Sequence, residues 1–193
     1  MILGVITIPY LYYTLKLYSL GRAVRPEYPW PHLSELWKTV VSGLGFFLAK
    51  KAIVWLTIDW NRRICKDQND PVALEKRADK ASRYIFMILY FIFATSYGYY
   101  TFKDAPFLPW WLGGSGTWEA MFEGAPYVKN APGAVTYAML QLGYHGGDLV
   151  HHHFFAVRQN DYAEMMVHHI AASALLFCMI FSNFATIGCV VAF

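Results

Sequence analysis

The sequence predicts an all-α protein, a polytopic bundle of membrane helices with about five full spans and a partial last helix. Two observations lead to this fold class. Hydrophobic residues make up 56% of the chain and charged residues 15%, whereas soluble domains carry about 25% charged residues. Long apolar runs cover residues 1–13, 85–97 and 170–193, and the last of them contains no charged residue. The length of 193 residues allows a single domain.

Hydrophobic periodicity and turn residues place the individual helices. The first helix should end near Gly21, before a proline-rich loop, and the last apolar piece is about half as long as a membrane span. The segment 103–133 is rich in proline, glycine and tryptophan, which is typical of an interfacial lid rather than a span. The predicted helices cover about residues 2–20, 36–60, 81–102, 134–155 and 161–181, with the last piece at 184–193.

Two lysines interrupt the second predicted helix. Lys50 and Lys51 lie near the middle of this segment, where a lysine costs roughly 2.5–3.5 kcal/mol on insertion scales. We therefore expect their side chains to face the protein interior or a water-filled cavity, or the segment to be bent.

The net charge of +3 is too small to indicate nucleic-acid binding, but the charge is unevenly distributed. Seven basic residues fall between Asn61 and Arg83, where we expect a loop on the cytosolic or matrix side. A basic belt on anionic lipid head groups is a compatible alternative. The three cysteines are scattered without CxxC spacing, which indicates neither a disulfide framework nor a zinc ribbon.

Five of the seven histidines fall within residues 146–170, between apolar flanks. On the predicted fourth helix, spacings of three and four residues place His145, Asp148 and His152 on one face. That face is polar within a membrane segment, and ionisable groups in such segments are functional candidates by default.

The predicted fifth helix carries a second polar face. Asp161, Glu164 and His168 lie within one stripe, and His169 lies one step round the helix. A tight turn joins the two helices, so they are antiparallel neighbours whose polar faces can meet in a pocket. The alternative is purely structural: Asp161 would form the N-cap of a capping box with Glu164, and Arg158 would pair with Glu164.

Three chemistries can use this cluster. A neutral imidazole, with a pKa of about 6.5, can take a proton from a nucleophile or accept an acyl group while Asp148 or Asp161 holds its tautomer. Iron in membrane desaturases needs about eight histidines in HxxxH and HxxHH boxes, which do not occur here. Haem ligation is the third option, but adjacent histidines point about 100° apart, so only one of His168 and His169 can face one metal. Acyl transfer without a metal is favoured.

The stretch that follows the fourth helix resembles the Lag motif of ceramide synthases, R-x-x-D-[FY]-x-E-M-x-x-H-H, followed by an apolar helix and I-G. Many fixed positions agree in order, which makes the motif specific. Weaker similarity begins near residue 76, so it covers about 76–193, whereas 1–75 hold N-terminal helices and the basic loop. The matching residues are Arg158, Asp161, Tyr162, Glu164, Met165, His168, His169, Leu175, Ser182, Asn183, Ile187 and Gly188.

This resemblance implies a TLC-domain fold, in which membrane helices enclose a long cavity. It implies N-acylation of a sphingoid base by a fatty acyl-CoA in the endoplasmic reticulum, with no cofactor besides acyl-CoA as substrate. His168 and His169 match the essential histidine pair of the family, and one of them would act on the acyl group or the amine. In the family an H-D-x-x-D cluster follows, and this sequence ends at Phe193 before it. The chain is then either a piece of an active enzyme or a shortened relative, in which Asp148 and residues 151–153 would substitute.

Two functions follow as expectations. The first is a membrane acyltransferase acting on acyl-CoA and a long-chain base, with the basic residues between 62 and 83 holding the CoA phosphates. The second is a non-catalytic subunit that binds membrane lipids or packs into a larger membrane complex, in the endoplasmic reticulum or in a mitochondrial or other organelle inner membrane. The predicted catalytic residues are His168, His169, Asp161, Asp148 and His152, and the predicted substrate-binding residues are Arg158, Glu164 and His145.

Overall fold

The computed structural model describes residues 2–27, 30–65, 70–124, 127, 129–158 and 160–191. Within these ranges the chain forms α-helices and short 3-10 helices and contains no β-strand, which confirms the all-α class. The α-helices are α1 (Ile2–Val24), α2 (Leu36–Ile64), α3 (Pro71–Phe102), α4 (Ala134–Phe154), α5 (Tyr162–Phe181) and α6 (Ala185–Val191).

Most helix positions agree with the sequence prediction to within a few residues, but α3 begins ten residues earlier than predicted, at Pro71. The side chain of Asp70 caps this end, because its Oδ1 accepts hydrogen bonds from the amides of Val72 (2.9 Å) and Ala73 (3.2 Å). Proline is favoured at the first helical position, since its missing N–H would have no partner there. The predicted basic loop of 61–83 is therefore wrong for most of its length, and its charges lie on the ends of α2 and α3.

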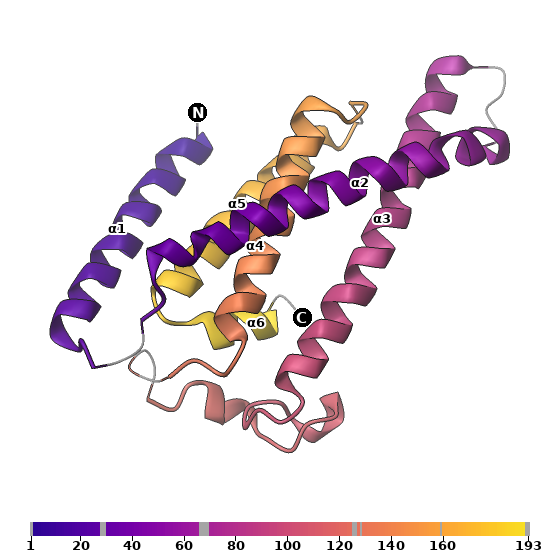
Figure 1. Ribbon diagram of the computed structural model, residues 1–193. Helices are drawn as coiled ribbons and strands as arrows, with labels where there is room; N and C mark the ends of the chain where they lie inside the picture. The colour runs from indigo at the N-terminus through magenta and orange to yellow at the C-terminus, as the bar shows by residue number, and fades with distance from the viewer. Residues whose placement is uncertain are drawn as a thin grey trace.

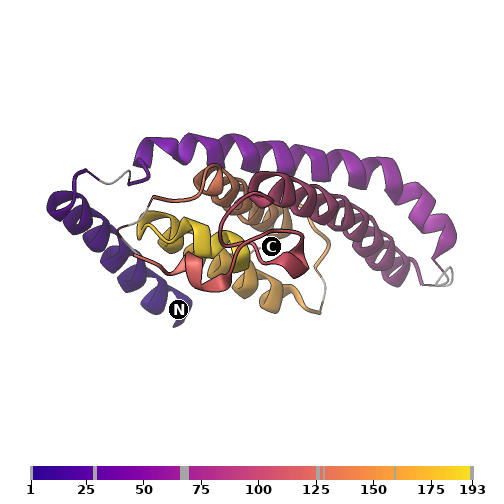
Figure 2. The ribbon, with the colours of Figure 1, turned by 90° about the horizontal axis from the view of Figure 1, so that it is seen from below.

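Helix α4 lies at the centre of the bundle. It packs against α2, α5 and α6, while α3 runs beside α2 and α1 packs on α5 (Figures 1 and 2). Segments α2, α3 and α5 are long and apolar enough to cross a membrane, with windows at Leu33–Ile64, Pro71–Phe102 and Tyr162–Phe181. The described parts of α1 and α4 do not meet the same criterion, so three of the five expected full spans are supported by length and composition.

The crossing of α2 and α4 depends on glycine. A Cβ at Gly143 would lie 2.8 Å from the carbonyl oxygen of Thr39, and one at Gly147 would lie 2.5 Å from that of Gly43. Gly143 and Gly147 stand four residues apart, the spacing that lets two membrane helices bring their backbones together. This approach fixes how residues further along α2 face α4.

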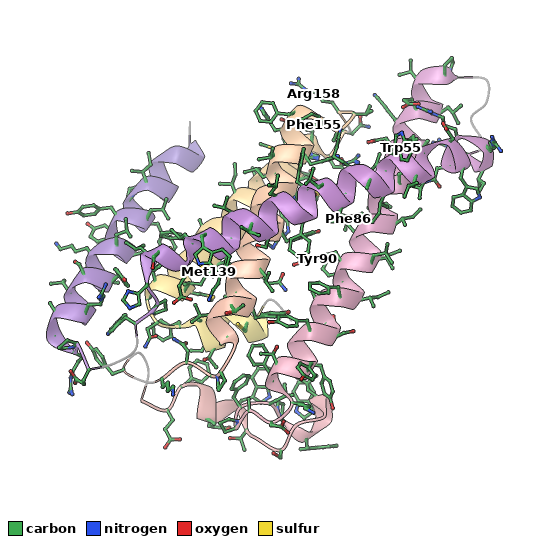
Figure 3. All side chains as sticks on the ribbon, viewed as in Figure 1. Trp55, Phe86, Tyr90, Met139, Phe155 and Arg158 are labelled. Atoms are coloured by element: carbon green, nitrogen blue, oxygen red, sulfur yellow. The ribbon has the colours of Figure 1, made fainter. Side chains whose placement is uncertain are left out.

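An aromatic cluster connects α3 to α4 and α2. The rings of Tyr90 and Tyr144 stack with centroids 3.4 Å apart, Phe46 meets both edge-on, and the Tyr90 hydroxyl donates to Oε1 of Gln141. Figure 3 places Tyr90 and Phe86 on the side of α3 that faces α2 and α4. Because edge-on ring pairs such as those of Phe46 contribute about 0.5–1.5 kcal/mol beyond area burial, this cluster helps set the rotation of α4.

The described residues between α3 and α4 form no long helix. It contains the 3-10 helices Trp110–Leu112 and Trp118–Met121, and Trp110 is 80% exposed. It closes against α6 through Asn130, whose Nδ2 donates to the Asn183 side chain and whose Oδ1 accepts from the Thr186 amide at 3.2 Å. The prediction of a non-spanning segment here is confirmed.

Candidate functional site

Asp148 is the centre of a buried polar array inside the bundle. Its Oδ1 forms an ion pair with Nζ of Lys50 from α2, and its Oδ2 lies 2.8 Å from Nε2 of His169 on α5. The three residues are buried, with exposed fractions of 3% for Lys50, 7% for Asp148 and 3% for His169. A buried carboxylate needs such partners, because an unpaired charge in an apolar interior costs several kcal/mol. The array joins α2, α4 and α5.

A second imidazole extends this array. Nδ1 of His145 lies 3.2 Å from Nδ1 of His169, and the two ring centroids are 5.5 Å apart. His145 is only partly buried, whereas His169 is fully inside. The prediction that the polar faces of the fourth and fifth helices meet is confirmed by these contacts.

His168 lies beside the array but on its outer side. Its side chain is exposed, and its ring centroid is 5.4 Å from that of His169 and 5.9 Å from that of His145. The expected divergence of adjacent helical side chains accounts for this difference. The two histidines of the motif therefore have different surroundings, one at the carboxylate and one at the surface of the helix pair. In the described part of the chain, no three histidine, cysteine or carboxylate side chains are placed to share a metal ion.

The other histidines of α4 face different neighbours. His152 is buried, its ring stacks on Tyr162 with centroids 4.9 Å apart, and its Nε2 lies 3.4 Å from the Tyr162 carbonyl oxygen. His151 is buried against Phe47 at 6.1 Å. His153 is exposed and its Nδ1 lies 2.8 Å from the Tyr162 hydroxyl. Of these three, His152 was predicted to be catalytic, and the contacts found for it tie the end of α4 to the start of α5.

Three further predicted residues lie at the turn between α4 and α5. Asp161 occupies the N-cap position of α5, but its side chain makes no cap hydrogen bond and instead accepts from Nζ of Lys80 at 2.9 Å. This hydrogen bond lowers the pKa of the Asp161 carboxyl below its usual value. Exposed Arg158 places its guanidinium 5.3 Å from the ring centroid of Tyr162, at the turn labelled in Figure 3, and forms no ion pair with the exposed Glu164. The expected capping box and Arg158–Glu164 pair are thus wrong.

The separation along α5 decides which carboxylate can orient the histidines. Asp161 precedes His169 by eight residues, or about 12 Å at 1.5 Å per residue. Asp148 is the carboxylate in contact with His169, and the structure brings His145, Asp148 and His169 together while Asp161, Arg158 and Glu164 stay at the turn.

Lys50 belongs to the array, although it was not among the predicted site residues. The sequence feature that pointed to Lys50 was its position in the middle of an apolar helix. The expectation that its side chain faces the interior is confirmed. Lys51 is exposed, with Nζ 4.3 Å from the ring centroid of Phe155. The neighbouring lysines therefore separate into one charge inside the bundle and one at its surface.

The basic residues at the ends of α2 and α3 are largely engaged by carboxylates. Arg62 donates to both oxygens of Glu75 at 2.9 Å, and Nε of Arg83 lies 3.0 Å from Oδ2 of Asp79. Because Lys80 is held by Asp161 as well, three cations expected to bind CoA phosphates have acidic neighbours within the chain.

An apolar groove of about 370 Å³ lies between α1, α4 and α5, and its lining includes Leu149 and Ile170, the residues that follow Asp148 and His169 in the sequence. Ser173 lies one turn after His169 on α5, and its Oγ is buried and has no hydrogen-bond partner among the described residues. The groove offers an apolar surface large enough for part of an alkyl chain. Its lining residues are Leu11, Leu15, Leu142, Leu149, Ile170, Ser173, Ala174 and Phe177.

These features define a polytopic α-helical membrane protein with a buried charged array at its centre. The profile of the TLC domain, shared by TRAM, LAG1 and CLN8 proteins, matches residues 80–193, and the chain belongs to this family. The match covers α3 from residue 80 onward and all of α4, α5 and α6, so the array lies mostly within it, while Lys50 lies outside. No curated protein and no solved structure matches the chain.

Proposed function

We propose that this protein transfers a fatty acyl group from acyl-CoA to the amine of a long-chain base, in the endoplasmic reticulum membrane. The observation that carries the proposal is the contact series from Asp148 through His169 to His145, in which a buried carboxylate meets one imidazole and that imidazole meets a second. Family membership and the Lag-like residues from Arg158 to His169 support it. The apolar groove between α1, α4 and α5 suits the alkyl chain of either substrate.

The reaction needs a base. A long-chain amine is protonated near neutral pH, and its nitrogen attacks a thioester only after losing a proton. A positioned imidazole that takes this proton typically contributes 10²–10⁴-fold to the rate. The C–N bond then forms, the C–S bond breaks, and the CoA sulfur leaves with a proton, giving an amide and free CoA. His168 and His169 are the proposed acyl-site histidines, and Asp148 holds the orientation of His169.

The predicted residues at the turn between α4 and α5 act in substrate binding in this proposal, apart from the chemical step. Exposed Arg158 and Glu164 lie at the end of the helix pair, where polar parts of CoA can reach them. Asp161 and His152 hold the turn itself, through Lys80 and Tyr162. We expect their substitution to weaken substrate binding more than the chemical step.

An amide-forming assay tests the proposal. Protein purified in nanodiscs is mixed with a panel of long-chain bases and acyl-CoAs, and amides are quantified by mass spectrometry. We expect product from wild-type protein and a 10²–10⁴-fold lower rate for His169→Gln. His153→Gln is the matched control on α4, since His153 is exposed outside the array. No amide from any pair of substrates would refute the proposal.

One observation favours the second function, a non-catalytic lipid-binding subunit. Lys50 and Asp148 already neutralise one another inside the bundle, as structural ion pairs do. Under this alternative the protein co-purifies with stoichiometric membrane subunits or bound lipid and releases no amide, whereas the acyltransferase works as the isolated chain.

A further inference from the structure

The contacts of the array determine where its protons lie. The Nε2 of His169 lies 2.8 Å from Oδ2 of Asp148 but is not aligned as a hydrogen-bond donor to any described residue. A bare nitrogen at this distance would repel the carboxylate oxygen, which only accepts hydrogen bonds, so the contact favours a proton on Nε2. In a neutral imidazole the other nitrogen is then an acceptor. The Nδ1 of His169 therefore accepts a hydrogen bond from the atom it faces, which is Nδ1–H of His145 at 3.2 Å.

Lys50 fixes the donor-to-acceptor direction of these contacts, with Asp148 as the final acceptor. Its ammonium has donors only, so its contact with Oδ1 favours the ionised form of Asp148 and prevents that oxygen from donating. With Nδ1 of His145 committed as the donor, the lone pair of Nε2 on the same ring is left free. His145 is also the partly exposed member of the array, whereas His169 and Asp148 are buried.

We infer that Nε2 of His145 is the proton acceptor of this site, that the acyl-site histidine His169 also fixes the tautomer of His145, and that Asp148 and Lys50 are positioning residues that hold His169. This inference rests on the proposed function and specifies its base. The ammonium of the long-chain base gives one proton to Nε2, which makes His145 an imidazolium. The freed nitrogen lone pair attacks the thioester carbon, the C–S bond breaks, and the departing CoA sulfur receives a proton from that imidazolium. The new amide nitrogen then loses its remaining extra proton to the regenerated Nε2, which passes it to water, so that one proton is released per turnover.

Nitrogen NMR tests the tautomer without any enzymatic readout. Wild-type protein labelled with ¹⁵N-histidine is studied in detergent, and signals are assigned by single His→Gln substitutions. We expect His145 to carry its proton on Nδ1 with Nε2 bare, and His169 to carry its proton on Nε2. A proton found on Nε2 of neutral His145 would overturn the inference.

Kinetics tests the role of that nitrogen. We expect His145→Gln to lower kcat by 10²–10⁴-fold with a smaller change in KM, while His153→Gln on the same helix stays within a few-fold of wild type. Retention of more than about one tenth of the activity by His145→Gln would refute the role of His145 and leave the proposed function standing. If wild-type protein forms no amide, the proposed function fails, and the role of His145 in it fails too. Where His145→Gln does not fold, the wild-type NMR result decides.

Discussion

The close approach of α2 and α4 is tested by adding one methyl group at Gly147. A Cβ there lies 2.5 Å from the carbonyl oxygen of Gly43 and 3.2 Å from its carbon, both backbone atoms that cannot swing aside. Gly146, the preceding residue of the same helix, has nothing within 4 Å of its Cβ position. Gly147→Ala and Gly146→Ala are therefore a matched pair, in which the same methyl group meets backbone in one variant and open space in the other.

The structure gives the size of the effect. At Gly147 the contact has to open from 2.5 Å to the 3.4 Å of an ordinary contact, a shift of about 0.9 Å. Overpacking that forces backbone shifts costs about 1–3 kcal/mol. Replacing glycine by alanine also stabilises a helix by up to about 1 kcal/mol, but this gain applies to both variants and cancels in their difference. We expect Gly147→Ala to be about 1–3 kcal/mol less stable than Gly146→Ala.

The assay is unfolding of the purified protein by SDS, followed by circular dichroism, with the free energy of unfolding compared between the two variants. Asp148 directly follows Gly147, so a displaced α2 also moves Lys50 away from the carboxylate. We therefore expect lower N-acyltransferase activity in Gly147→Ala than in Gly146→Ala. Free energies within about 0.5 kcal/mol of one another would show that the two backbones are not in contact and would refute the packing argument.

Two more predictions concern the periphery of the bundle. Asn183 is buried at φ 63° and bonded to Asn130, so Asn183→Ala should cost about 2–4 kcal/mol in unfolding free energy from backbone strain and the lost hydrogen bond. Asn183→Gly keeps the left-handed backbone and should recover the strain component only; equal losses in the two variants would rule out strain. The pKa of the Asp161 carboxyl is lower in the folded protein than its unfolded-state value of 3.8. The pair with Lys80 therefore stabilises the fold above pH 3.8, and this stability is lost as the pH falls through the folded-state pKa. Lys80→Met should therefore cost about 0.2–1 kcal/mol at pH 7, and this cost should shrink steadily as the pH is lowered below 3.8. A cost that does not fall in acid would contradict the pairing.

The helices were predictable because their apolar runs are long and end at glycine or proline. The start of α3 was missed because its first turns are polar and charged, and a charged helix end has no apolar periodicity to distinguish it from a loop. The signals that place it, Asp70 as a cap and Pro71 at the first position, were present in the sequence.

The candidate site was predictable in its parts but not in its connections. Spacing alone placed His145 and Asp148 on one face, and it predicted that His168 and His169 would point apart. The pairing of Lys50 with Asp148 joins residues 98 positions apart, and it depends on how α2 is rotated and how closely it crosses α4. The sequence marked both residues as unusual, but their contact follows from the glycine-dependent packing of the two helices.

The central claim is that Lys50 and Asp148 form a buried pair that orders the histidines, and a double-mutant cycle tests it most directly. We expect Lys50→Met and Asp148→Leu each to cost about 3–5 kcal/mol in unfolding free energy, because each leaves an uncompensated buried charge. The double variant should cost much less than the sum, with a coupling of at least about 2 kcal/mol. Lys51→Met, which removes the exposed neighbouring lysine, should show no coupling to Asp148→Leu. Costs for Lys50→Met and Asp148→Leu that add to within about 0.5 kcal/mol would contradict the account.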